Sequence, residues 1–208
     1  MNPQDLSAIG AGFMQEAYGS QLVFRAALQA LSHPGRLVDV THDAQVPRLG
    51  HAASAALLLA LLDADCSLWL SPTLRASDAA AWLRFHTGCQ LAATPDQAQF
   101  AWVAAGDALP ALEAFAGGSE NYPDQSTTCV IDVAGLGHAA DEGQDWRLSG
   151  PGIQGGACLR VTGLPPDFVA QWAANHAAFP RGVDLFLATP QQIVGLPRST
   201  RIEHTVEA

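Results

Sequence analysis

The stretch from His51 to Leu70 contains the most apolar run of this 208-residue chain. It reads HAASAALLLALLDAD and then CSLWL, and its first part is apolar almost all the way round a helix. A helix without a polar face has to be well buried, so other structure must surround it. Asp63 and Asp65 interrupt the run, and we therefore interpret it as a buried helix and strand, not as a transmembrane segment.

Helices and strands alternate through the first half of the chain, and strands dominate the second half. The patterns predict helices that end near residues 33, 65 and 88, and further helices over 106–118 and 165–180. They predict a turn over 71–73, a hairpin over 182–197, and strands over 36–40, 66–70, 98–104, 127–136, 145–149, 158–161 and within 198–208. This order is typical of an α/β sandwich with a mixed sheet and an antiparallel part, formed as one domain over residues 1–208.

The first and third of these helices carry clear local signals. Four apolar residues lie roughly on one side of the first helix: Leu22, Phe24, Leu28 and Leu31. His33-Pro34-Gly35 then ends it. In the helix over 77–88, Ser77 is a candidate N-cap and Gly88 a C-terminal stop.

Gly150, Gly152 and Gly155, in LSGPGIQGGACLRV, have the G-x-G-x-x-G spacing of a dinucleotide-binding turn. Such glycines follow a strand and open a helix, because the helix N-terminus holds the pyrophosphate. Alternation in Asp145–Ser149 predicts the strand, but the residues after Gly155 predict a second strand in place of a helix. We therefore expect a hairpin in which Gly150, Pro151 and Gly152 form a structural turn. A ligand-binding loop of another kind is the alternative.

Apolar residues make up 49% of the chain and charged residues 14%, which favours a globular protein over a disordered one. So few charges also predict apolar surface that is buried against another chain, such as a second copy in a homodimer. The formal net charge of −10 argues against partners such as nucleic acid or an anionic membrane.

All ten basic residues are arginines, and the chain contains no lysine. It therefore has no Schiff-base lysine for pyridoxal phosphate and no Walker-type lysine for ATP phosphates, and we expect no such cofactor. Any anion site in this chain has to use arginine or backbone N–H groups.

The four cysteines are far apart in the sequence and include no C-x-x-C pair: Cys66, Cys89, Cys129 and Cys158. The first ten residues, MNPQDLSAIG, are acidic and poor in apolar residues, so we do not interpret them as a secretory leader. These features favour reduced thiols in a cytoplasmic protein.

Motifs for metal binding or nucleophilic catalysis are weak. His42 and His51 are too far apart to form a helical ligand pair, and His176 has no partner near it, so we expect surface or capping histidines and no metal. There is no G-x-S-x-G motif, and three of the cysteines fall in predicted strands, where cysteine is a small buried apolar residue.

His86 is a first candidate for substrate binding, because it stands at a helix end beside Arg84 and Thr87. A ligand or an interface contact is one interpretation. The other is that this histidine interacts only with the dipole of its own helix.

Arg181, Arg198 and Arg201 bring three of the ten arginines into the last part of the chain. The fork of an arginine suits phosphate or carboxylate, so Arg181 and Arg198 are further candidates for binding an anionic substrate. The alternative is that these side chains pair with acids such as Asp184 or Glu203.

Taken in order, several segments resemble a known family. They are FRAALQALSHPGRLV, LLLALLDADCSLWL, LRFHTG, LSGPGI, FPRGVDLFL and LPRSTRIE, and they span about Tyr18 to Glu203. Their order resembles the PhnH family, a subunit of the bacterial carbon–phosphorus lyase system for phosphonate breakdown. The GPGI turn, FPRGVDL and LPRST in this order are specific, whereas any one of them alone is not.

The resemblance implies a three-layer α/β sandwich with a mixed sheet, similar to the pyridoxal-phosphate-dependent transferases but without that cofactor. It implies a homodimer in isolation and a core complex with the G, I and J subunits of the system. With the G and I subunits, and with the L subunit assisting, such a chain takes part in displacing adenine from ATP with a phosphonate. The product is a ribose-1-phosphonate 5-triphosphate. The resemblance implies no catalytic residue in this chain.

Three hypotheses about function remain open at this point. The chain is a purely structural subunit of a phosphonate-processing assembly, or it contributes part of the ATP or phosphonate site through Arg181, Arg198 or His86. The third hypothesis is a stand-alone enzyme on a degenerate transferase fold, of which the lysine content disfavours a pyridoxal version.

The absence of lysine gives a first prediction. Incubation with pyridoxal phosphate followed by borohydride should attach no cofactor to a side chain, because no lysine can form the internal aldimine. Mass spectrometry of the digested protein measures this directly. A reduced cofactor adduct on any side chain would contradict the prediction.

Overall fold

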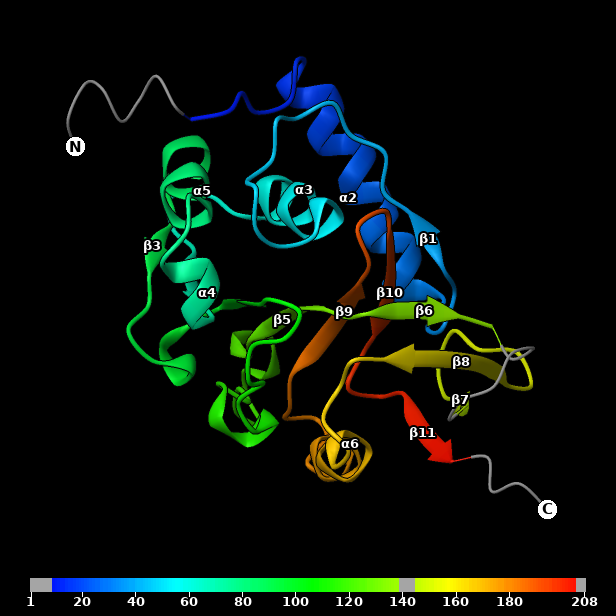
Figure 1. The fold of residues 1–208 in the computed structure, drawn as a ribbon. Helices are drawn as coiled ribbons and strands as arrows, with labels where there is room; N and C mark the ends of the chain where they lie inside the picture. Colours follow the sequence, from blue (N-terminus) through cyan, green and yellow to red (C-terminus); the bar gives the residue numbers. More distant parts are fainter. Residues whose placement is uncertain (1–8, 139–144, 205–208) are drawn as a thin grey trace.

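The computed structural model describes residues 9–138 and 145–204. A seven-stranded mixed sheet runs through the middle of the molecule (Figure 1). Its order is β1-β10-β9-β5-β4-β2-β3, formed by Val38–Asp39, Gln192–Leu196, Asp184–Ala188, Thr128–Asp132, Phe100–Val103, Ser67–Leu70 and Gln90–Leu91. The five strands from β9 to β3 are parallel, and β10 is antiparallel to both of its neighbours.

Helices cover one face of this sheet, and α3 (Ala52–Leu61) packs between α2 (Glu16–Ser32) and α5 (Ala79–Thr87) (Figure 1). Every residue from Ala53 to Leu58 is buried, as the all-round apolar sequence predicts. Ten residues of helix are about 15 Å long, half of the hydrocarbon thickness of a bilayer. Within 9–138 and 145–204, no helix has the length and apolarity needed to cross a membrane.

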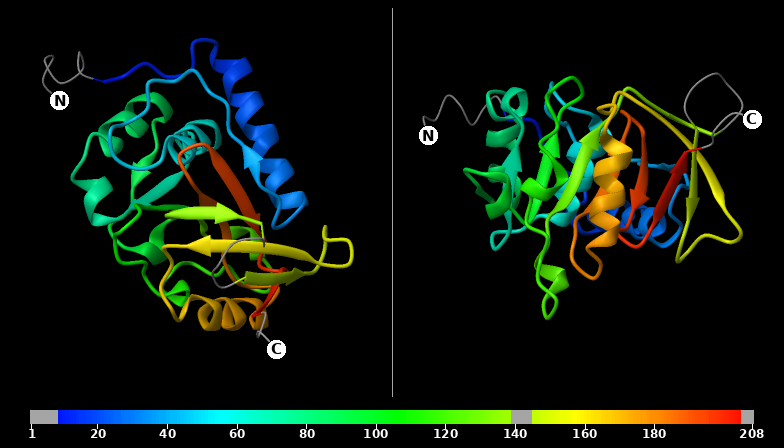
Figure 2. Two further views of the ribbon diagram at one scale, coloured as in Figure 1. Left: turned by 45° about the vertical axis from the view of Figure 1, so that its right-hand side comes forward. Right: turned by 90° about the horizontal axis from the view of Figure 1, so that it is seen from below.

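The other face carries α6 (Phe168–Ala177) and a second, four-stranded antiparallel sheet (Figure 2). The order of this sheet is β11-β7-β8-β6, formed by Arg201–His204, Asp145–Ser149, Ala157–Thr162 and Gly135–Gly137. Trp146 of β7 stacks on Phe168 of α6 with ring centroids 5.4 Å apart. The prediction of an α/β protein with a mixed sheet and an antiparallel part is therefore confirmed.

Alternation along the central strands fills both sides of the main sheet. In β4, Trp102 belongs to the apolar core under the helices, whereas Ala101 belongs to the core under α6 and the small sheet. In β9, likewise, Phe186 belongs to the core under the helices and Leu185 to the core under α6 and the small sheet. Because both faces are buried, these strands are continuous apolar runs in the sequence.

The glycine-rich stretch is a hairpin, as expected, and not a dinucleotide-binding turn. β7 and β8 pair antiparallel, and no helix follows Gly155, because β8 begins at Ala157. Gly150, Gly152 and Gly155 all have positive φ, at 136°, 82° and 77°. The N–H of Ile153 donates to the carbonyl of Gly150 and closes the turn. Gly150, Pro151 and Gly152 thus lie in the turn between β7 and β8, and their purely structural role stays a prediction.

Four local predictions were wrong in detail. Residues 71–73 begin a short helix, α4 (Pro72–Arg75), and 106–118 contains only the 3-10 turn η2 (Leu112–Ala114), since its proline and glycines disfavour a regular helix. The predicted strand over 127–136 divides at Ala134, where the chain passes from the main sheet to the small one. Asp78, not Ser77, is the residue at the N-cap of α5, although the Ser77 hydroxyl accepts the N–H of Ala79.

Three of the four apolar residues predicted on one side of the first helix face outward. Leu22, Phe24 and Leu28 are exposed, while α2 buries Val23 and Ala27, together with Ala30, against the rest of the protein. The sequence pattern identifies the helix correctly, but the inner side is the one with the smaller residues.

The hairpin turn gives a stability prediction with an internal control. A Cβ on Gly152 would collide with the carbonyl oxygen of Ser32, whereas a Cβ on Gly155 would meet nothing within 4 Å. Both glycines have similar positive φ, so alanine strains the backbone equally at the two sites. Gly155→Ala should lower the free energy of unfolding by about 1 kcal/mol and Gly152→Ala by about 2 kcal/mol or more.

Urea unfolding of both variants measures the difference. Equal losses for the two variants would contradict the collision with Ser32 as the reason for glycine at residue 152.

Candidate functional site

A pocket of about 820 Å³ opens between α6 and the segment 111–118. One wall comes from the helix and its ends: Asp167, Ala170, Gln171, Ala174, Asn175 and Ala178. The facing wall is formed by Ala111, Leu112, Glu113, Phe115, Gly117 and Gly118, and the lining is completed by Arg181, Gly182 and Val183. The pocket thus combines apolar walls with a few polar groups, which is typical of a small-molecule site.

Amide side chains of α6 fix the two walls relative to each other. Gln171 accepts the backbone N–H of Leu112 at 3.0 Å and donates to Asp167 at 2.8 Å. Asn175 accepts the N–H of Val183 at 2.8 Å and donates to its carbonyl at 3.0 Å. These two amides are therefore engaged in hydrogen bonds within the protein, and they tie α6 to Leu112 and to Val183.

Arg181 is the one arginine among the described residues that line this pocket. Its side chain is exposed and has no hydrogen-bond or ion-pair partner in the part of the chain that the structure describes. Its backbone is fixed, because its N–H donates to the carbonyl of Ala178 at 3.0 Å. Arg181 is thus a lining residue whose guanidinium has no partner among the described residues, and such a group suits an anion.

Arg198 lies behind the pocket in a different environment. Its guanidinium donates to both carboxylate oxygens of Asp184, and its backbone N–H donates to the same carboxylate at 2.7 Å. Its remaining donors bind the carbonyls of Pro123, at 2.8 Å, and Pro180, at 3.3 Å, and the hydroxyl of Ser126. The side chain is only 11% exposed. The ion pair with Asp184, weighed as the alternative from the sequence, is thus present.

Arg201 and His176 extend this group of polar contacts. His176 donates from Nδ1 to the carbonyl of Arg198 at 2.9 Å and accepts Arg201 Nε on its other ring nitrogen at 3.2 Å. His176 is therefore a link between α6 and the segment that follows β10.

His86 lies on the opposite side of the main sheet and does not join the arginines. Its Nε2 donates to the carbonyl of Gly10 at 2.9 Å, and the indole of Trp82 donates to the same oxygen at 2.9 Å. The ring also packs edge-on against Trp82 and Phe85. Among the three residues proposed for substrate binding, the structure brings Arg181 and Arg198 to one region and leaves His86 holding the segment before α2.

The carboxyl ends of β4 and β5 hold a polar cluster that the sequence did not reveal. Asp132 is 2% exposed and accepts hydrogen bonds from the Ser54 hydroxyl at 2.5 Å, the Trp102 indole at 3.0 Å and the His51 backbone N–H at 2.8 Å. Burial raises the pKa of Asp132, and the donors oppose this in part. Ligands often bind at this edge of an α/β sheet, but here the chain's own side chains fill the place and hold the start of α3.

The histidines and cysteines considered from the sequence for metal binding or nucleophilic catalysis have other surroundings in the structure. His51 donates from Nε2 to the carbonyl of Val133 at 3.0 Å. In residues 9–138 and 145–204, no three His, Cys, Asp or Glu side chains gather where they would hold a metal ion. The four cysteines are free thiols, and burial raises the pKa of Cys89 and Cys129.

The family model for the bacterial phosphonate metabolism protein PhnH matches residues 11–203. The chain belongs to the PhnH family. It is 39% identical over 191 residues to the alpha-D-ribose 1-methylphosphonate 5-triphosphate synthase subunit PhnH of Rhizobium meliloti (strain 1021). The aligned residues cover 92% of this chain and 94% of that protein. It is 33% identical over 187 residues to the putative C-P lyase subunit protein HtxG of Stutzerimonas stutzeri, covering 90% and 87%. The resemblance inferred from the sequence motifs is confirmed.

Three of the motifs that carry the resemblance to PhnH meet at one place in the fold. A Cβ on Gly150 would lie 2.9 Å from the carbonyl oxygen of Ser199 in LPRST, and a Cβ on Gly152 would collide with Ser32 in LSHPG. Gly35 of LSHPG lies against Leu148 of β7. The GPGI turn therefore joins the end of α2 to the segment after β10, away from the residues that line the pocket.

The same substitution, arginine to glutamine, should change the free energy of unfolding by different amounts at the two arginines of this region. Arg198→Gln leaves the Asp184 carboxylate without its guanidinium partner, so we expect a loss of about 2 kcal/mol in the free energy of unfolding. Arg181→Gln removes no contact within the described chain and should change stability by less than about 0.5 kcal/mol. Chemical denaturation of the two variants tests this, and equal effects would refute the assignment of Arg198 to the fold.

Proposed function

We propose that this chain is the PhnH subunit of an α-D-ribose 1-methylphosphonate 5-triphosphate synthase in phosphonate breakdown. The observation that supports this most is the 39% identity to a subunit of that name across nearly the full length of both chains. The family match over residues 11–203 agrees with it.

In the proposed reaction, an oxygen of the phosphonate bonds to C1′ of the ATP ribose, and the bond from C1′ to adenine breaks. The electron pair of that bond leaves with adenine, which takes up a proton. Both reactants are anionic, so the site has to supply positive charge near the phosphonate or the triphosphate.

Arg181 is the residue through which we propose that this chain contributes to that charge. It is exposed at a pocket of suitable size and its side-chain donors have no partner among the residues that the structure describes, whereas the donors of Arg198 are bound within the fold. Arg198 then acts as a positioning residue for the neighbouring segments. We assign no substrate contact to His86, whose ring binds Gly10.

We further propose that the protein acts in a complex with its companion synthase subunits and does not catalyse the reaction alone. The pocket lining contains one arginine beside two carboxylates, Glu113 and Asp167, which is little positive charge for two anionic reactants. A homodimer of the isolated chain remains a prediction, as does kinship with the pyridoxal-phosphate-dependent transferases. The mixed sheet, covered on both faces, supports that kinship.

The experiment measures adenine release from ATP by the assembled synthase, with methylphosphonate present or absent. We expect Arg181→Gln to lower the methylphosphonate-dependent rate about tenfold or more, because a charged hydrogen bond to the substrate is lost. The matched control is Arg48→Gln, since Arg48 is exposed and lies outside the pocket lining. Size-exclusion chromatography verifies that both variants assemble.

Two results would count against these proposals separately. A fully assembled Arg181→Gln complex with the wild-type rate would remove Arg181 from the site but keep the subunit assignment. A wild-type assembly that releases no adenine in response to methylphosphonate would overturn the proposed function itself.

A further inference from the structure

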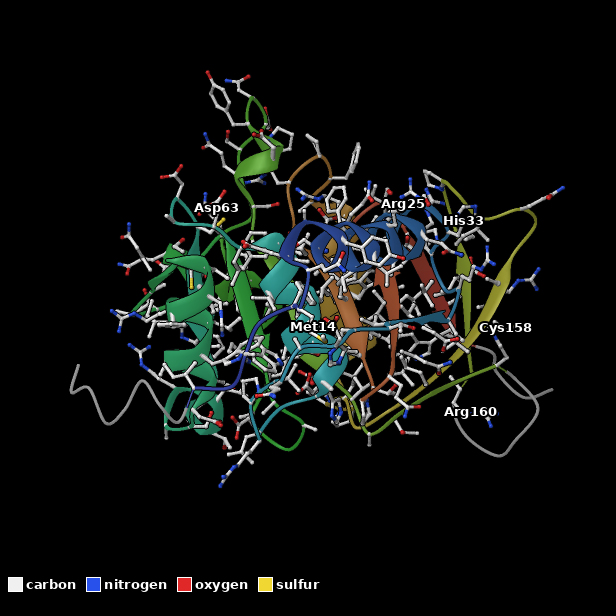
Figure 3. The ribbon with its side chains drawn as sticks, turned by 90° about the horizontal axis from the view of Figure 1, so that it is seen from above. Met14, Arg25, His33, Asp63, Cys158 and Arg160 are labelled. Carbon is white, nitrogen blue, oxygen red and sulfur yellow. The ribbon has the colours of Figure 1, made fainter. Side chains whose placement is uncertain are left out.

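The outer side of α2 exposes an unusual number of large apolar side chains. Figure 3 views the molecule from the side on which α2 begins, with Arg25 of the helix labelled, together with Met14 before it and His33 after it. Five residues form what we call the α2 face: Met14, Tyr18, Leu22, Phe24 and Leu28. Their side chains are exposed to 82%, 64%, 40%, 45% and 52%, in the same order. Tyr18, Leu22, Phe24 and Leu28 lie on adjacent rows of one side of α2, and Met14 stands two residues before the helix begins.

The inner side of the same helix explains why these residues stay outside. α2 buries the small residues Val23, Ala27 and Ala30, and it approaches the main sheet so closely that a Cβ on Gly195 of β10 would lie 2.6 Å from Ala30. This close approach leaves no room for large side chains beneath the helix. The large apolar residues are therefore free to meet a second surface.

The α2 face is large enough to form the centre of an interface. Taking about 200 Å² for a large apolar side chain, the five residues expose roughly 570 Å² of side-chain surface. This is comparable to the largest apolar patch of a typical monomer, which is often functional. A standard interface covers roughly 800 Å² on each partner, so a polar rim around the α2 face would complete one.

The charges around the α2 face indicate what kind of partner fits it. Arg25 lies on this side of the helix, is exposed, and has no hydrogen-bond or ion-pair partner in the chain as described. Glu16, the one acid of α2, is nine positions earlier and thus on the opposite side of the helix. At the C-terminal end, His33 and Arg36 are exposed as well.

A second copy of this chain would match the α2 face poorly. It would bring the same apolar residues with a second Arg25, and no carboxylate on the face to neutralise either guanidinium. Asp43, an acid beyond α2, accepts the N–H of Met14 just before the helix begins, about 16 Å along the axis from Arg25. A different protein with a carboxylate in an apolar surface would satisfy Arg25, whereas burying it unpaired is costly.

We propose that the α2 face is the surface on which a companion subunit of the synthase docks, with an apolar surface that carries a carboxylate opposite Arg25. This inference rests on the proposed function, because that function supplies the companion subunits. It adds the place of contact and the chemistry of the partner's surface.

The test uses the whole chain, co-expressed with the companion synthase subunits, and a double variant, Arg25→Glu with Leu28→Gln. The matched control makes the same two changes in the loop before α3, Arg48→Glu with Leu49→Gln, where Leu49 is 46% exposed. Affinity purification through a tag on this chain measures how much of each companion subunit is retained. Thermal unfolding of the isolated variants verifies that both are folded.

We expect the α2 variant to retain at least tenfold less companion subunit than the wild type, with the control unchanged. Equal retention by the α2 variant and the wild type would overturn this inference while leaving the proposed function intact. A variant that keeps its companions but converts an isolated dimer to monomers would also overturn it, because the face would then join two copies. Failure of the wild-type chain to retain any companion subunit would overturn both proposals.

Discussion

The hydrogen bonds of Arg198 with Asp184 join the segments on which the candidate site depends. Asp184 begins β9, Pro123 belongs to the 3-10 turn η3 (Pro123–Gln125), and Pro180 precedes the arginine of the pocket. One guanidinium thus connects the segments 123–126 and 180–184 to its own segment after β10. Because Gly182, two residues after Pro180, also donates to the carbonyl of Gly117 in the facing wall, the pocket is built on segments that this arginine holds in place.

This arrangement explains why the two arginines of FPRGVDL and LPRST have different roles despite similar surroundings in the sequence. Both follow a proline, and both were candidates for an anion. Only the fold shows that Arg198 faces Asp184, fourteen positions earlier, across the β9–β10 hairpin, while Arg181 is among the residues that line the pocket. Pairing of this kind depends on strand register, which sets the partner of each side chain and is not a local property of the sequence.

Local patterns of the sequence were sufficient for most of the helices and strands. The buried α3, the β7–β8 hairpin and the β9–β10 hairpin each follow from periodicity and turn residues within about fifteen positions. The order of strands in the sheet did not follow, because it depends on contacts between distant segments. The Asp132 cluster was missed for the same reason, since Ser54, Trp102 and Asp132 come together only when α3 is placed over β4 and β5.

The helix α2 shows a second limit of prediction from pattern. Its apolar residues identify a helix, but apolarity alone does not say whether the larger or the smaller residues lie against the sheet. Here Gly195 lets the backbone of α2 approach β10, so the alanines face inward and Leu22, Phe24 and Leu28 face outward. A glycine in a distant strand thus decides which side of the helix is available to a partner.

The distribution of arginines supports a shared site rather than a self-sufficient one. The chain carries ten arginines and no lysine against twenty acidic residues. Near the pocket, Arg198 is bound to Asp184 and Arg201 to His176, which leaves Arg181 as the arginine of the lining. A triphosphate and a phosphonate together repel an acidic protein unless positive charge is concentrated where they bind. Under the proposed function, most of that charge has to come from the companion subunits or from ions they bind, and Arg181 would act at the edge of a site that forms only in the assembly.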